Sequence, residues 1–294
     1  MEELLTLAPD DIIILGDVYL EEKGLIDLPG HIIYNNEFVI SDENDKPTLD
    51  RVNLISRKNF VPDTFPNAKK LYANMANNHT YDFGVECFER TLNLLENEKV
   101  YCYGNHFNQC KVVHEVNGFK FNLLGYDTTG ASKTKKPEDI ISLMEHDIPC
   151  ARKLGAQKII ITIHFGEEHE PQNGEDQQII ARKAIDLGAD IIVGHHPHCI
   201  QNIEIYKDKH IFYSLGNTWF PRHSTPAYFD KNGKMTRVFR GRETSWNTES
   251  LVVIYNLKSG IVKIKKAKCR NKTFKFVKNI TVEEVNDYCF KWPK

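Results

Sequence analysis

The chain repeats one feature that restricts its fold more than any other: short, continuous apolar runs that end abruptly in polar residues. The clearest are IIIL at 12–15, IIITI at 159–163 and IIV at 191–193. Apolar residues that do not alternate with polar ones are typical of strands covered on both faces. The runs therefore predict a sheet buried between other layers.

Helical patterns lie between several of these runs. Residues 175–189 carry an apolar face and end at Gly188, a residue typical of a helix C-terminus. Residues 137–155 form a further helical pattern, which we expect to bend at Pro149. In residues 85–99 the predicted apolar face consists of Val85, Phe88, Leu92 and Leu95. Alternating strands and helices predict an α/β fold with helices on the sheet faces.

The tail of the chain shows a different pattern. Between about residues 250 and 280, two apolar stretches alternate with polar residues around a Ser-Gly turn. This pattern predicts antiparallel strands added to a sheet edge. Because no repeat, low-complexity block or linker is visible, we predict a single domain over residues 1–294 with this strand-rich extension at its end.

The composition excludes several classes of protein. Lys and Arg number 38 against 40 Asp and Glu, and 41% of residues are hydrophobic, which argues against a disordered chain or a general polyanion binder. The basic stretch at 263–278 alternates with apolar residues as a half-buried strand does. We therefore predict no nucleic-acid partner.

The cysteines and the N-terminus indicate a cellular compartment. Seven scattered cysteines without a CxxC pair favour reduced thiols over a disulfide framework or a thiolate zinc site. Acidic residues stand where a secretory signal has basic ones, and the first apolar run is too short to span a membrane. We predict a cytoplasmic protein without an integral membrane segment.

The residues that follow the apolar runs share one chemistry. In open α/β sheets ligands bind beyond the carboxyl ends of the strands, so we expect these residues at one sheet edge. Each alone has an ordinary structural explanation, such as a turn or a solvated acidic loop at 167–170, but together they offer the oxygen and nitrogen ligands of divalent metals. They lie in five stretches: Gly16-Asp17, Asn35-Asn36-Glu37, Asn77-Asn78-His79, His164 to Glu168, and His195-His196-Pro197-His198. Their convergence predicts a metal site.

Three motifs carry a family resemblance: ANNHTYDFG at 76–84, GHHPHCIQ at 194–201 and YSLGN at 213–217. In this order and spacing, within about residues 11–217, the chain resembles the CapA family of poly-γ-glutamate capsule proteins, which belongs to the calcineurin-like metallophosphatase superfamily. The resemblance implies a sandwich of two β-sheets flanked by helices, an α/β/β/α arrangement. It also implies one or two divalent metal ions, manganese, zinc or iron, at the strand ends.

The resemblance implies roles for single residues. The implied metal ligands are Asp17, Glu37, Asn78, His164, His196 and His198. The implied catalytic residues are His79, Asp82, Glu168 and His195, with Asp82 orienting the ring of His79. Gln201 and Asn217 occupy family positions near substrate. Superfamily enzymes usually begin Asp-x-His, whereas this chain has Asp17-Val18-Tyr19, which leaves open whether one metal or two are bound.

The activity has three alternatives at this point. The first is a metal-dependent hydrolase or acyl-transferring enzyme acting on γ-glutamyl or peptide-like amide bonds of a small or oligomeric substrate. The second is a phosphodiesterase or phosphomonoesterase with the same site. Arg222, in a turn-rich stretch, suits a phosphate and a glutamate carboxylate equally. The third is a non-catalytic scaffold for polymer or peptide biosynthesis, and the oligomeric state is left open.

Overall fold

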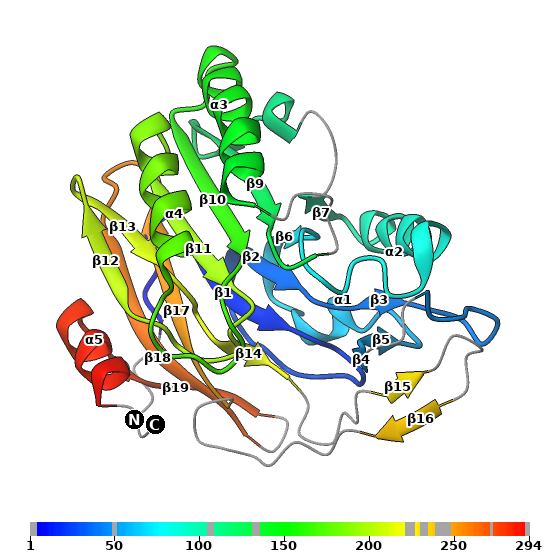
Figure 1. The fold of residues 1–294 in the computed structure, drawn as a ribbon. Helices are drawn as coiled ribbons and strands as arrows, with labels where there is room; N and C mark the ends of the chain where they lie inside the picture. The colour runs from blue at the N-terminus through cyan, green and yellow to red at the C-terminus, as the bar shows by residue number, and fades with distance from the viewer. Residues whose placement is uncertain are drawn as a thin grey trace.

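Two β-sheets face each other in the structure, a computed structural model, and helices cover their outer faces (Figure 1). The structure describes residues 5–48, 52–104, 109–130, 136–220, 227–229, 235–238, 248–270 and 273–291. The predicted α/β/β/α sandwich with helices on its faces is confirmed.

Sheet 1 combines parallel strands with the antiparallel extension of the tail. In spatial order its strands are β19 (Thr273–Asn279), β18 (Val262–Arg270), β17 (Glu249–Asn256), β1 (Asp11–Val18), β2 (Gly30–Asn36), β6 (Ala68–Asn74) and β7 (Val100–Tyr103), and β14 (Asn217–Trp219) also pairs with β1. The extension predicted near 250–280 therefore joins the sheet beside the first strand of the chain, as an antiparallel addition.

Sheet 2 lies across the sandwich from sheet 1. Its strands are β12 (Ile203–Tyr206), β13 (Lys209–Phe212), β11 (Ile191–His195), β10 (Lys158–His164), β9 (Phe119–Asp127) and β8 (His114–Val116). Short strands pair outside both sheets: β3 (Val39–Ile40) with β5 (Ile55–Ser56), and β15 (Ala227–Phe229) with β4 (Val52–Asn53) and β16 (Met235–Val238). The apolar run at 12–15 lies in sheet 1, whereas those at 159–163 and 191–193 lie in sheet 2. The prediction that the residues after these runs share the edge of one sheet is therefore wrong.

Five α-helices and one 3-10 helix lie in the described part of the chain. They are α1 (Val61–Thr64), α2 (Gly84–Asn97), η1 (Gln109–Lys111), α3 (Pro137–Lys153), α4 (Glu175–Leu187) and α5 (Val282–Phe290). Figure 1 shows α3 and α4 side by side over sheet 2, and α2 on the side of sheet 1. Helix α4 ends at Gly188, which adopts a φ of 113°, as its sequence predicts. Helix α3 continues through Pro149.

The predicted buried face of α2 needs one correction. Val85 is 58% exposed, whereas Cys87, Phe88, Thr91 and Leu95 are buried. Val85 lies in the first turn on the side that faces outward, and the buried stripe starts at Cys87 in the same turn. Small and polar residues therefore contribute to a face that the apolar pattern assigned to large residues.

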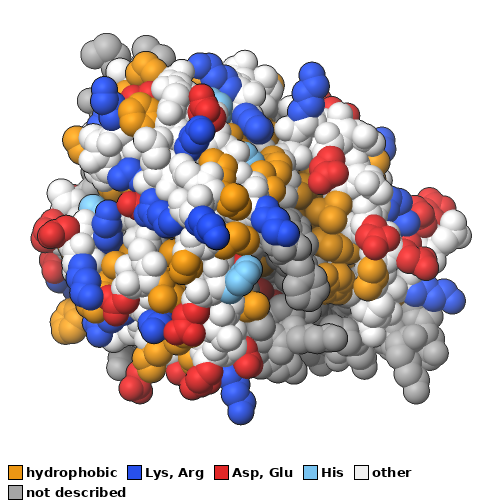
Figure 2. All heavy atoms as spheres, turned by 90° about the horizontal axis from the view of Figure 1, so that it is seen from above, with side chains coloured by type: hydrophobic (Ala, Val, Ile, Leu, Met, Phe, Trp, Pro, Cys, Tyr) orange, Lys and Arg blue, Asp and Glu red, His pale blue; other side chains and the backbone are white. Residues whose placement is uncertain are grey.

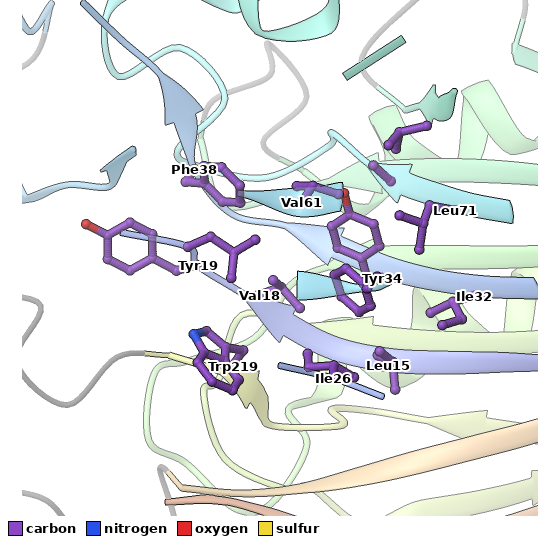
Figure 3. Packing of buried hydrophobic residues seen from close by; sticks show 14 of the residues in the cluster. Leu15, Val18, Tyr19, Ile26, Ile32, Tyr34, Phe38, Val61, Leu71 and Trp219 are labelled. Carbon is purple, nitrogen blue, oxygen red and sulfur yellow. The ribbon is translucent and has the colours of Figure 1, made fainter. Parts of the chain in front are cut away.

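Strand β1 shows how the sequence specifies both layers of the core. Side chains of a strand alternate between its faces, so every residue of an unbroken apolar run meets a core. Ile12 and Ile14 belong to the cluster between the sheets, and Ile13 and Leu15 to the cluster on the outer face of sheet 1. Figure 3 shows this outer cluster, in which Ile26 lies between Trp219 and Leu15 in this view, and Tyr34 lies near Leu71.

The surface seen in Figure 2 carries acidic and basic side chains that are interspersed rather than gathered by sign. Among the described helices, none has the length and apolar character needed to cross a bilayer.

Helix α5 joins the extension to sheet 2, because Asn286 donates to the carbonyl of Ile203 at 2.9 Å and accepts from its N–H at 2.7 Å. Residues of the extension, including Ile264, also pack in the core between the sheets. These contacts agree with the single domain, which stays a prediction.

Candidate metal centre

Strand register brings polar residues together at one end of the sandwich. In sheet 1, Asp17 pairs with Asn35, and Asn35 pairs with Asn74. In sheet 2, His164 pairs with His195. The carboxyl ends of the parallel strands from both sheets therefore meet, and their polar side chains face one another.

The turn after β11 has an unusual backbone. His196 and His198 adopt φ angles of 99° and 55°, a region that non-glycine residues enter at a cost of about 1–3 kcal/mol each. Gly194 precedes them, and a Cβ there would lie 1.9 Å from the carbonyl oxygen of Tyr213. Glycine thus lets the strand approach its neighbour closely, and the strained turn directs two imidazoles toward the other strand ends.

Asp17 lies at the centre of these contacts and is fully buried. Asn35 Nδ2 donates to its Oδ1 at 2.8 Å, and His195 Nδ1 lies 3.2 Å from the same oxygen. His198 Nδ1 lies 3.4 Å from Oδ2, which also accepts the His196 backbone N–H at 3.4 Å. Burial opposes ionisation, but the contacts with His195 and His198 outweigh it and hold the pKa of Asp17 well below its usual range.

Glu37 is the second buried carboxylate of the site, and its situation differs. It is fully buried, and neither carboxylate oxygen has a hydrogen-bond partner among the described residues. His198 Nε2 lies 3.5 Å from Oε1, and His164 Nε2 lies 3.7 Å away. Burial raises the pKa of Glu37 well above its usual range, despite the attraction of His198.

A divalent cation fits this arrangement. Ligand atoms of Glu37, His196 and His198 all lie within 4.8 Å of one another, and the orphaned carboxylate supplies negative charge beside two imidazoles. Oxygen and nitrogen donors of this kind suit zinc, manganese and iron. Burial opposes protonation of His198, but Glu37 and Asp17 raise its pKa to about 10. A metal ion bound by His198 would replace this proton and supply the positive charge beside the two carboxylates.

His164 connects the two sheets within the site. Asn35 Nδ2 donates to its Nδ1 at 3.3 Å, and its Nε2 donates to Asn78 Oδ1 at 2.8 Å. His196 Nδ1 lies 3.1 Å from the same Nε2. Burial, followed by the charge of His196, lowers the pKa of His164 well below its usual range. The ring is therefore kept neutral, which is the form that coordinates metals.

His79 and Asp82 form a buried pair beside the centre. His79 Nδ1 lies 2.7 Å from Asp82 Oδ2, which also accepts the N–H of Leu54 at 2.9 Å. Both side chains are buried. A carboxylate in this position selects the tautomer that carries its proton on Nδ1, and it leaves Nε2 available to exchange a proton.

The other predicted site residues lie in varied surroundings. Glu168 is exposed at the rim, although its charge contributes to the raised pKa values of Glu37 and His198. His198 Nδ1 donates to Asn217 Oδ1 at 3.0 Å. His195 is buried; its Nδ1 faces Asp17 Oδ1 at 3.2 Å, and its Nε2 has no hydrogen-bond partner among the described residues. Only Arg222, predicted to bind substrate, lies outside the described residues.

Gln201 does not face the cluster. Its Nε2 donates to the carbonyls of Glu170 and Gln172 at 2.8 and 3.3 Å, and its Oε1 accepts from Gln177 at 3.0 Å. The side chain thus anchors the loop after β10 to helix α4. Its predicted contact with substrate stays a prediction.

Two amides were not assigned a role from the sequence. Asn35 bonds Asp17 and His164, and Asn74 Nδ2 donates to Asn35 Oδ1 at 3.0 Å. Asn35 ends an apolar run, the same signal that identified Asp17, but nothing in the sequence distinguishes it from the neighbouring Asn36 and Glu37. Asn74 lies inside its run, where no sequence signal marked it.

A cleft of about 650 Å³ opens beside the centre. Its walls include His196 from the centre, Phe165 and Glu167 from the loop after β10, and Gln177 from α4. A substrate in this cleft would reach the candidate metal ligands from the side of sheet 2.

The fold and these contacts define an α/β sandwich protein with a candidate metal centre where its strands end. The chain belongs to the family described as bacterial capsule synthesis protein PGA_cap, whose family model matches residues 30–222. The match includes every site residue named above except Asp17.

Curated relatives agree with this family. The chain is 30% identical over 202 residues to "Capsule biosynthesis protein CapA" of Bacillus anthracis, covering 64% of this chain and 49% of the relative. It is 35% identical over 158 residues to "PGA biosynthesis protein CapA" of Bacillus subtilis (strain 168), covering 50% and 42%. "Uncharacterized protein y4sH" of Sinorhizobium fredii is 44% identical over 81 residues, covering 26% and 18%. The chain thus spans about half the length, or less, of the curated relatives it matches.

Proposed function

We propose that this chain is a metal-dependent hydrolase or acyl-transferring enzyme acting on amide bonds. The observation that carries the proposal is Glu37, a fully buried carboxylate without a hydrogen-bond partner among the described residues, placed beside His196 and His198. Burying a carboxylate without hydrogen bonds costs several kcal/mol, and a bound cation would offset that cost. The proposed ligands for one or two divalent ions are Asp17, Glu37, Asn78, His164, His196 and His198.

The residues around the ions would each have a separate task. A divalent ion bound there supplies Lewis acidity and lowers the pKa of water from the bulk value toward roughly 7. His79, oriented by Asp82, protonates the leaving group. Asn35 holds Asp17 and His164 in position through one amide group. Glu168, at the rim, is a second candidate for proton transfer, and His195 and Asn217 position the turn that carries His196 and His198.

The substrate class follows from the relatives and the cleft. The names of two relatives connect them with capsule and PGA biosynthesis, and we extend this to a γ-glutamyl or peptide-like amide as substrate of this chain. The cleft of about 650 Å³ has room for a small molecule or for the end of an oligomer. Because the same ligands also serve phosphoester hydrolysis, a phosphodiester is included in the test.

The first test is metal content. We expect plasma mass spectrometry to find one or two fewer equivalents of manganese, zinc or iron in the double variant Asp17→Ala, His196→Ala than in the purified wild-type chain. The matched control is His210→Gln, which changes a half-buried histidine on β13 outside the centre. This variant should keep its metal. Unchanged metal in the double variant would overturn the proposed centre.

The second test separates the three activities. The metal-loaded chain is assayed with a γ-glutamyl anilide and with bis-p-nitrophenyl phosphate, alongside His79→Gln. Cleavage of the anilide that is lost in His79→Gln, with metal retained, supports the amide hydrolase. Cleavage of the phosphodiester alone favours the phosphoesterase, and a metal-loaded chain inactive on both favours the scaffold.

A further inference from the structure

A second group of ligand-type side chains lies where η1 meets α3 and shares no residue with the centre above. Cys110 comes from η1, and His146, Asp147 and Cys150 come from α3. Ligand atoms of Cys110, His146 and Asp147 all lie within 4.8 Å of one another. The thiol of Cys150 lies near that of Cys110 and contributes to its raised pKa, although Cys150 is outside the group of three. Positions 146 and 150 are four apart, so both side chains emerge on the same side of α3.

Asp147 has the surroundings of a ligating carboxylate. It is buried, and its Oδ1 lies 3.0 Å from His146 Nδ1. Its Oδ2 accepts from Gln109 Nε2 at 3.3 Å and from the Tyr126 hydroxyl at 3.1 Å. Among the described residues, no Lys or Arg forms an ion pair with it. Neutral donors thus hold one oxygen, as they commonly do in metal sites, and leave the other facing His146 and the thiols.

We propose that Cys110, His146, Asp147 and Cys150 form a second metal site that takes a zinc-like cation. Two thiols, one imidazole and one carboxylate make a four-ligand set of the kind that zinc occupies. Thiolates also distinguish it from the centre at the strand ends, whose ligands are oxygen and nitrogen only. His146 is exposed and Cys150 half-buried, so the cation enters from solvent.

Binding displaces the thiol protons. Without a cation, burial together with Cys150 and Asp147 raises the pKa of Cys110 to about 12, which argues against a reactive thiolate there. A divalent ion coordinates the sulfur atoms as thiolates and releases their two protons to solvent. This proposal departs from the sequence prediction that favoured reduced thiols over thiolate zinc, because the fold brings Cys110 and Cys150 near each other although no CxxC pair connects them.

Cobalt titration tests the site. The full chain, freed of metal by a chelator and kept reduced by a phosphine, is titrated with Co²⁺, whose complexes with thiolates have an intense near-ultraviolet charge-transfer band. We expect a band that saturates at one equivalent, that zinc abolishes, and that persists in Glu37→Gln, where the centre at the strand ends is disabled. This background also excludes a signal from Cys199, the cysteine next to His198.

Three variants complete the experiment. Cys150→Ala should lower the intensity of the band per bound Co²⁺ to about half, because Cys110 remains as one thiolate, and His146→Ala, an exposed change that leaves the core intact, should weaken Co²⁺ binding at least tenfold. Cys269→Ser alters another half-buried cysteine, on β18, and should leave the titration unchanged. The absence of a thiolate band in the folded wild type would overturn the proposal, and so would a band of unchanged intensity in Cys150→Ala or binding that is unaffected by His146→Ala.

Discussion

Glu37 and Asp190 are both buried carboxylates at strand ends, yet their surroundings are opposite. Glu37 follows β2 at the carboxyl end and has no hydrogen-bond partner among the described residues. Asp190 precedes β11 at the amino end, where it accepts the N–H of Ile159 at 2.9 Å, Arg152 Nη2 at 2.5 Å and Lys209 Nζ at 3.1 Å. A buried carboxylate whose hydrogen bonds are all made stabilises the fold. A buried carboxylate without hydrogen bonds is available to bind a ligand.

The pKa values of the two groups follow the same division. Burial raises the pKa of Glu37 well above its usual range. Burial acts in the same direction on Asp190, but the Ile159 N–H and Arg152 outweigh it and lower the pKa of its carboxyl. The amino end of sheet 2 is therefore built for stability and the carboxyl end for binding. Four predictions test this division, beginning with the largest effect.

Glu37→Gln should remove metal binding without weakening the fold. We expect the affinity for Mn²⁺ or Zn²⁺ at the strand-end centre to fall by more than about 100-fold, because losing a ligand costs more than losing its supporting contact. The free energy of unfolding in the presence of a chelator should stay equal or rise, since the buried charge is gone. Calorimetric titration and urea unfolding measure the two quantities. Unchanged affinity, or a clear loss of metal-free stability, would contradict the role of Glu37 as a ligand.

Asp190→Asn should have the reverse effect. We expect about 2–3 kcal/mol of unfolding free energy to be lost at pH 7, because charge-assisted hydrogen bonds from Arg152 and Lys209 are removed, while metal content is unchanged. The folded pKa of Asp190 lies below its unfolded value, so its stabilisation is complete above about pH 4 and disappears as the pH falls through the folded pKa. Urea unfolding of both proteins between pH 3 and pH 8 checks this. A difference that persists undiminished at pH 3 would contradict the assignment.

The sequence predicted this division only in part. The apolar runs identified β1, β10 and β11 and the polar residues directly after them, because strands buried on both faces leave a clear pattern. Neither Asn74, inside a strand, nor the contact between Arg152 and Asp190 could be predicted in this way. Both depend on register and on packing between elements far apart in the chain, which no local pattern encodes.

Asp147 is intermediate between Glu37 and Asp190, because its Oδ2 has hydrogen-bond donors but these donors are uncharged. Tyr126→Phe removes one donor to Oδ2 and should weaken Co²⁺ binding at the proposed η1–α3 site by about tenfold, because the carboxylate is less firmly oriented. The cobalt–thiolate band measures this affinity. Tyr103→Phe is the matched control, since Tyr103 is equally buried but its hydroxyl accepts from Thr162 in the core between the sheets. Equal effects of the two changes would show that the loss is one of packing rather than of ligand orientation.

His114 extends the comparison to an imidazole at the amino end, where no ligand is expected. It packs against the rings of Tyr72, Tyr101 and Phe121, and burial, followed by the charge of Lys70, lowers its pKa to about 4. The folded pKa lies below the unfolded value of about 6.5, so the neutral ring stabilises fully above that pH and the stabilisation declines as the pH falls toward 4.

Between pH 8 and pH 6 the wild type should therefore lose about 1 kcal/mol of unfolding free energy that His114→Phe, which keeps an aromatic ring but does not titrate, retains. Urea unfolding in the presence of a chelator isolates this effect from metal binding at the strand-end centre. An equal pH dependence in both proteins would mean that His114 is as accessible to protons in the folded chain as in the unfolded one. In that case β8 would not belong to the stabilising end of the sandwich, and the boundary between the two ends would lie elsewhere.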